Sequence, residues 1–382
     1  MARGASPARR RWPGGLLAML ALVAVIESAI ARGELACTSP WAQDWRQTGR
    51  AARGESPGRA ILCFGDSLAK FGVHPPTFEA RLGHRAYGLA LGAGTAPASY
   101  YLLRRALGAG ARPEAVLVDY EPHILADDPR ASSRLWPELL TPGEAVDLAV
   151  TTRDASLLAW TLVAGLLPSA RDRFEIREAL GDALRGEPSP RGLLVLAHWR
   201  NWQKNLGGQL MAPNSKYHGE PDSLVGANRI LYPKSWEWNA VNVRYVRRFL
   251  ALAARRGVPV FWLIPPAAPE LQRRRERSGA DAAFEAFVRA IAADFPGVTV
   301  LDARRSGYVA SRFIDPIHLD RDGALAFSDD LADAVGRRLA EHGNGPRWEA
   351  LPAYRARPTS GRFEDLEQSA LALLAAQRGS AR

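Results

Sequence analysis

The stretch ILCFGDSL, residues 61–68, decides the fold of this 382-residue chain. A short apolar run that stops at a glycine is typical of a buried parallel strand and the turn at its carboxyl end. Open α/β folds place their ligand sites outside that edge of the sheet. We therefore expect Ser67 to lie at a functional site.

Four more apolar runs resemble this strand, and helical patterns separate them along the chain. The expected strands cover residues 60–64, 86–91, 115–120, 258–264 and 298–302. The expected helices cover residues 75–82, 98–107, 241–255, 281–294 and 322–339. This alternation predicts an α/β fold with a mostly parallel sheet and right-handed crossovers. Between residues 123 and 238 the alternation gives way to helical pieces, prolines and tryptophans, which predicts a large helical insertion.

A second short motif, FIDPIHL at residues 313–319, places an aspartate three residues before a histidine. The Asp315 carboxylate could orient one imidazole nitrogen of His318 and leave the other free as a base. A serine hydroxyl needs such a base to act as a nucleophile at neutral pH. We therefore predict that Ser67, His318 and Asp315 are catalytic. The alternative is that Ser67 or Asp66 only caps a helix and that His318 lies on the surface.

Together the two motifs resemble the first and last sequence blocks of the SGNH/GDSL hydrolase superfamily. The resemblance covers residues 60–125 and 240–340. It implies a flavodoxin-like three-layer sandwich with a five-stranded sheet, in which the Ser67 turn lies beside the His318 loop. It also implies an oxyanion hole that includes the backbone N–H of Ser67 and of a glycine after the second strand. Gly92 is the favoured glycine and Gly94 the alternative.

One block departs from the family pattern. Where the family has Gly-x-Asn-Asp after the third strand, this chain has VDYEP at residues 118–122. Without an asparagine there, Asn201, Asn205 or Tyr120 could supply the third donor to an oxyanion.

The closing motif, followed by Gly323-Ala324, is similar to that of the periplasmic, membrane-anchored branch of the superfamily, which includes polysaccharide O-acetylation proteins. This similarity implies a serine esterase or an O-acyltransferase whose substrate is an acylated glycan or a similar ester. The alternative is a catalytically degenerate domain that binds polysaccharide or scaffolds an envelope assembly. The insertion contains four tryptophans that could line a sugar cleft or form its core, namely Trp199, Trp202, Trp236 and Trp238.

The N-terminus has the pattern of an export signal. Arginines precede an apolar core at residues 16–26, and a small-x-small site follows at residues 29–31. An uncleaved signal-anchor is the favoured interpretation, and a cleaved signal or a lipoprotein box at residues 35–37 are the alternatives. Each of these predicts that the rest of the chain lies outside the cytoplasm, in the periplasm or cell envelope, or secreted after cleavage.

These patterns divide the chain into four parts: a signal segment at 1–37, a linker at 38–59, an SGNH-like domain at 60–342 and a peripheral tail at 343–382. Within the insertion, residues 148–167 are strongly apolar, but Arg153 and Asp154 interrupt them. We expect a buried or lid helix there rather than a second membrane span.

The composition favours a globular protein and excludes several classes. A net charge of +10 is compatible with an anionic partner, but no nucleic-acid-binding motif accompanies it, so we expect no nucleic-acid partner. The two cysteines, Cys37 and Cys63, rule out a disulfide scaffold and leave a single bridge as a minor alternative. The histidines have no metal-ligand spacing, and we expect no metal or other cofactor.

Overall fold

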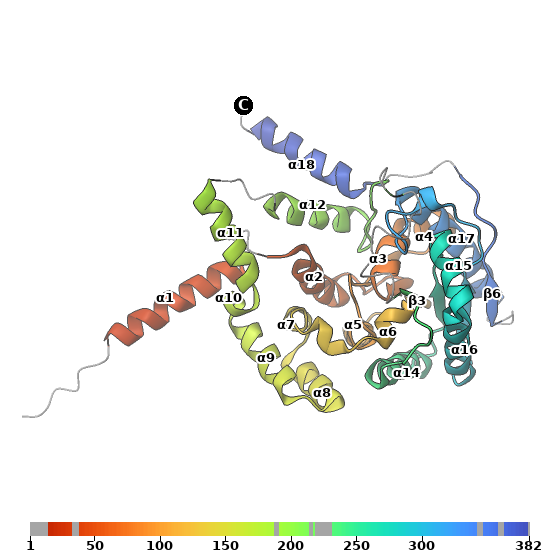
Figure 1. The fold of residues 1–382 in the computed structure, drawn as a ribbon, viewed down its shortest axis with the longest axis horizontal. Helices are drawn as coiled ribbons and strands as arrows, with labels where there is room; N and C mark the ends of the chain where they lie inside the picture. The colour runs from red at the N-terminus through yellow and green to blue at the C-terminus, as the bar shows by residue number, and fades with distance from the viewer. Residues whose placement is uncertain are drawn as a thin grey trace, which may run out of the picture.

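In the computed structural model, the described residues are 14–32, 38–186, 191–213, 217, 231–341, 347–357 and 363–380. They form an α/β fold around one open sheet of six parallel strands (Figure 1). The strands are β1 (Ile61–Phe64), β2 (Ala86–Gly88), β3 (Ala115–Asp119), β4 (Val260–Ile264), β5 (Val298–Asp302) and β6 (Trp348–Ala350). Their order across the sheet is β2-β1-β3-β4-β5-β6, so β1 and β3 are neighbours at the point where the chain reverses direction across the sheet. The α/β class is as expected, and each of the five expected strand ranges contains one of β1 to β5, but the sheet has a sixth strand that the sequence did not indicate.

Side chains of each strand alternate between two hydrophobic cores, because successive residues of a strand point to opposite faces. Leu62 and Phe64 enter one core, and Ile61 and Cys63 enter the other. The first core is covered by α2 (Pro40–Gly54), α5 (Ala96–Gly108), α14 (Ala240–Arg255) and α16 (Ala280–Ala293). The second is covered by α3 (Ser67–Gly72), α4 (Pro75–Leu82) and α17 (Arg321–Ala340). α15 (Pro269–Ser278) packs on α16.

The insertion is helical, as expected. It contains α6 (Pro122–Ala126), the 3-10 helix η1 (Pro129–Ser132), α7 (Trp136–Leu139), α8 (Pro142–Thr152), α9 (Ala155–Leu166), α10 (Pro168–Arg171), α11 (Arg173–Arg185) and α12 (Arg191–Lys204). The apolar stretch at 148–167 is split, because Arg153 ends α8 in a left-handed conformation and the Asp154 carboxylate caps α9. Of the two expected alternatives, a buried or a lid helix, the buried one is wrong, since α9 buries only Leu157, Thr161 and Ala164.

Residues 38–59 were expected to form a linker, but they contain a helix. Residues 40–54 form α2, whose start combines a capping hydroxyl at Ser39 with a proline at the first helical position. Trp45 is fully buried in the first core and packs edge-on against Trp136. These contacts make α2 part of the folded body.

The tail is not peripheral. Trp348–Ala350 adds β6 beside β5, so the sheet has six strands rather than five. α18 (Leu366–Ser380) packs on α12 of the insertion. The Glu364 carbonyl ahead of α18 accepts hydrogen bonds from the side chains of Asn201 and Asn205. The 3-10 helix η3 (Ala310–Arg312) precedes the His318 loop.

The N-terminal helix α1 (Gly14–Ala31) projects away from the body (Figure 1). Among the described residues, it is the one helix long and apolar enough to cross a membrane, a property that a signal sequence shares. Only Ile30 within it is buried. Cys37 and the arginines at residues 3, 9, 10 and 11 lie outside the described residues, whereas Cys63 is a buried free thiol.

Candidate active site

The nucleophile candidate sits on a sharp turn at the carboxyl end of β1. Gly65 has a φ of 131°, and a Cβ there would lie 1.7 Å from Oδ1 of Asp119, so only glycine fits. The Asp66 carboxylate caps α3 by accepting the N–H of Leu68 at 2.8 Å. Its other oxygen accepts the N–H of Glu121 at 2.7 Å, which ties the turn after β1 to the turn after β3. Ser67 is therefore the first residue of α3 and is half-buried.

The second motif forms a closed loop between η3 and α17. Phe313 pairs with Leu319 in an antiparallel bridge, and both side chains are buried. Inside the loop, Oδ1 of Asp315 accepts the backbone N–H groups of Ile317 and His318, each at 2.9 Å. The aspartate therefore shapes the backbone that carries the histidine.

The structure brings the three predicted catalytic side chains into one line. His318 Nε2 lies 2.7 Å from Ser67 Oγ, across 251 residues of sequence. His318 Nδ1 lies 2.6 Å from Asp315 Oδ2. The ring of Phe71 packs edge-on against the imidazole at a centroid distance of 5.4 Å. Ser67 and His318 are both half-buried, so each keeps part of its surface exposed to solvent.

The charges set the direction of these hydrogen bonds. Burial opposes ionisation of Asp315, but the hydrogen bonds from His318 and from the loop backbone outweigh it and lower the pKa of Asp315. Because an ionised carboxylate only accepts, Nδ1 of His318 must donate to it. In a neutral ring, Nε2 is then the acceptor of the Ser67 hydroxyl. This is the arrangement that general-base activation of a serine requires.

No protein-family model matches the chain, and no curated protein matches it significantly.

The glycine expected in the oxyanion hole is held by α2. The N–H of Gly92 donates to Oδ2 of Asp44 at 3.2 Å, and its carbonyl accepts Nε1–H of Trp45 at 2.9 Å. A Cβ at Gly92 would lie 1.8 Å from the ring of Trp41. The Gly92 N–H is thus engaged by a carboxylate in this structure. The Gly94 N–H is also engaged, by the carbonyl of Leu91 at 3.0 Å.

Asp44 also binds a buried lysine. Its Oδ1 contacts Nζ of Lys70, whose side chain is 0% exposed and lies one turn after Ser67. Burial outweighs the attraction of Asp44 and lowers the pKa of Lys70. The sequence patterns described above do not predict this pair. Two sequence features mark its members: Lys70 is a lone lysine in an apolar stretch, and Trp41 and Trp45 flank Asp44. No sequence pattern indicates that these two segments are in contact.

Asp119, in the block that departs from the family pattern, is buried beside the carboxyl group of Asp66. Oδ1 of Asp119 accepts the N–H of Asp66 at 3.2 Å, while its Oδ2 is buried without a partner. Burial, and then the charge of Asp66, raise the pKa of Asp119 well above its usual range. These effects favour a protonated Asp119, which unlike a carboxylate can donate a hydrogen bond.

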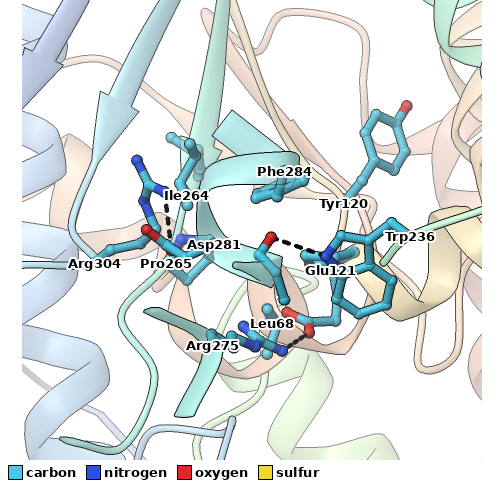
Figure 2. A pocket seen from close by; sticks show the side chains of 13 residues that line it. Leu68, Tyr120, Glu121, Trp236, Ile264, Pro265, Arg275, Asp281, Phe284 and Arg304 are labelled. Atoms are coloured by element: carbon cyan, nitrogen blue, oxygen red, sulfur yellow. Dashed lines mark hydrogen bonds and ion pairs between the residues drawn. The ribbon is translucent and has the colours of Figure 1, made fainter. Parts of the chain in front are cut away.

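The other donor candidates point elsewhere. The side-chain amides of Asn201 and Asn205 donate to the Glu364 carbonyl. Tyr120 is buried with its ring against Trp262, and Figure 2 shows its hydroxyl directed away from the neighbouring cavity. The structure therefore brings together the serine, histidine and aspartate. Of the predicted oxyanion donors, the Ser67 N–H, at the first position of α3, has no acceptor within its helix.

A small cavity borders the site beyond Leu68, the residue after the nucleophile (Figure 2). Its polar lining is internally paired: Glu121 with Arg275, and Asp281 with Arg304 at 2.9 Å. Burial of Glu121 opposes its ionisation, but Arg275 and His123 lower the pKa of Glu121 to about 2. In the described part of the chain, no cluster of three or more His, Cys, Asp or Glu side chains could hold a metal ion.

The insertion tryptophans pack in pairs. Trp199 stacks on Trp202 at 4.9 Å, and Trp236 stacks on Trp238 at 5.5 Å. All four contact the first core, which favours the interpretation that they are structural. Trp236 also lines the cavity of Figure 2, where its Nε1–H donates to the Ala280 carbonyl at 3.0 Å.

Proposed function

We propose that this protein is an exported, membrane-anchored serine acyl-hydrolase or O-acyltransferase of the SGNH type, acting on an acylated glycan or a similar ester. The observation that carries the proposal is the continuous hydrogen-bonded line from Ser67 through His318 to Asp315. Support for the anchor comes from the length and apolar composition of α1.

In this mechanism, Ser67 Oγ attacks the ester carbonyl while His318 Nε2 takes the hydroxyl proton. His318 then gives that proton to the departing alcohol, which leaves an acyl-serine. In the second half, His318 deprotonates the acceptor, which attacks the acyl-serine and releases Ser67. Water as the acceptor makes the enzyme an esterase, and a sugar hydroxyl makes it a transferase. The Ser67 N–H is placed to stabilise the oxyanion, and the Gly92 N–H could join only after leaving Asp44.

The engagement of Gly92 by Asp44 favours a second candidate function. A domain that stabilises the oxyanion poorly could bind polysaccharide or scaffold an envelope assembly without turnover. This alternative predicts that Ser67 has no effect on reactions with small esters.

The test is hydrolysis of p-nitrophenyl acetate by the full chain in detergent, for the native protein and Ser67→Ala, with and without an oligosaccharide acceptor. We expect Ser67→Ala to lower turnover by about 10³-fold or more, since removal of a nucleophile collapses triad catalysis. Acetylated oligosaccharide in the native reaction would identify a transferase. Equal turnover by both proteins would refute the enzyme proposal and favour the scaffold.

A further inference from the structure

Exposed apolar side chains gather on four consecutive helices of the insertion, α8 to α11. They include Leu166, which is 78% exposed, and Leu184, which is 89% exposed. The full set is Val146, Val150, Leu162, Val163, Leu166, Leu167, Phe174, Leu180 and Leu184. Outside α1 and these four helices, the comparably exposed large apolar side chains of the described residues are Trp41, Leu194, Leu196, Val309 and Leu371. Soluble proteins rarely leave apolar side chains clustered in this way unless the surface binds something.

We call these nine side chains the apolar face. The helices that carry them contact one another in order, α8 with α9, α9 with α10 and α10 with α11, and α1 contacts α10. The Glu27 carboxylate of α1 accepts the N–H of Ser169 in α10 at 2.8 Å and also the Ser169 hydroxyl. Ile30, the buried residue of α1, lies one turn further along the helix. Figure 1 shows α1 leaving the molecule beside α10, on the side where α9 and α11 also lie.

The length of α1 indicates where the contact between Glu27 and Ser169 lies relative to the membrane. Its 18 residues span about 27 Å at 1.5 Å per residue, slightly less than the roughly 30 Å hydrocarbon core of a bilayer. An anchor this short must use almost its whole length to cross. Glu27 is four residues, or about 6 Å, from the end of α1, and so lies near the membrane boundary. The start of α10, which is bonded to Glu27, must lie at the same level.

We infer that the apolar face of α8–α11 rests on the lipid surface beside the anchor. This inference relies on α1 being the membrane anchor of the proposed function. We infer lipid as the partner because the apolar face is continuous with the anchor. Leu166 and Leu167 immediately precede α10, which contacts α1. α9 has no charged residue between positions 155 and 166, so contact of this helix with lipid would bury no charge. The face would hold the catalytic body at a fixed height and orientation above the bilayer.

The test is a depth measurement on the full chain in phosphatidylcholine vesicles. The background is Cys37→Ser with the buried Cys63 kept, and Leu166→Cys or Leu184→Cys carries a bimane fluorophore. Matched labels at Leu20 in α1 and at Val309 in the α/β body serve as references. Interfacial helices bury their apolar face about 5–10 Å deep, so acyl-chain doxyl lipids should quench the labels at 166 and 184 at least about twofold more than the label at 309.

The label at position 20 distinguishes failure of the lipid contact from failure of the anchor. Quenching at position 20 without excess quenching at 166 and 184 would overturn the lipid contact and assign the face to another protein or a second copy. An unquenched label at position 20 would overturn the anchor itself, and the inference with it. If a labelled variant fails a thermal-unfolding check, Val150 and Phe174 provide replacement sites on the same face.

Discussion

Asp315→Asn should lower kcat for p-nitrophenyl acetate about 10⁴-fold, with little change in KM, as loss of the orienting carboxylate does in other triads. The reason lies in the direction of the hydrogen bonds. An asparagine amide can donate to Nδ1 of His318, which leaves the ring proton on Nε2. That nitrogen then faces the Ser67 hydroxyl as a donor at 2.7 Å and can no longer accept its proton.

The matched control is Asp333→Asn, a half-exposed aspartate that pairs with Arg81 on the surface. Its kcat should equal that of the native protein. Steady-state kinetics of both variants test the prediction, and circular dichroism checks that Asp315→Asn keeps its fold, since Asp315 also holds two backbone N–H groups of its loop. A kcat within about tenfold of the native value would contradict the assigned role of Asp315.

Asp44→Ala should lower the free energy of unfolding by about 3–5 kcal/mol, the usual cost of removing one partner from a buried ion pair. Lys70 would be fully buried without its counter-charge, so it would carry an unpaired charge or give up its proton, and the Gly92 N–H would lose its acceptor. Urea unfolding at neutral pH measures the loss. Asp333→Ala is the control, because both partners of the Arg81–Asp333 pair are 37% exposed and exposed pairs contribute about 0–1 kcal/mol.

A double variant, Asp44→Leu with Lys70→Met, separates the buried charge from the lost packing. Hydrophobic replacement of a whole buried pair is often neutral or stabilising, so we expect the double variant to be more stable than Asp44→Ala. Equal losses in the two variants would mean that the unpaired charge of Lys70 is not the cause.

The sheet and the triad could be predicted because their signals are local. A run of four apolar residues ending in Gly-Asp-Ser marks a strand and its turn, and Asp315 precedes His318 by the three residues that one closed loop needs. Parallel strands share one carboxyl edge, so the alternation of strands and helices predicts that both motifs lie at that edge. Only the resemblance to the SGNH/GDSL superfamily implied that the two motifs lie side by side. In the structure they meet although β3 and β4 separate β1 from β5.

The features that could not be predicted depend on contacts between distant segments. α2 lies in a stretch rich in Pro, Gly and Arg, and its stability comes from Trp45 packed in the core rather than from helix propensity. β6 has three half-exposed or exposed residues and owes its place to pairing with β5. The engagement of Gly92 by Asp44 joins residues 48 positions apart, which no short motif encodes.

The central claim is that Ser67 is a nucleophile activated by His318. The most direct measurement is the intact mass, followed by peptide mapping, of the full chain treated with a fluorophosphonate, which reacts with activated serines. We predict one adduct on Ser67 in the native protein and no adduct in His318→Ala, although Ser67 is present in both. No adduct in the native protein, or an equal adduct on Ser67 in both proteins, would contradict the claim.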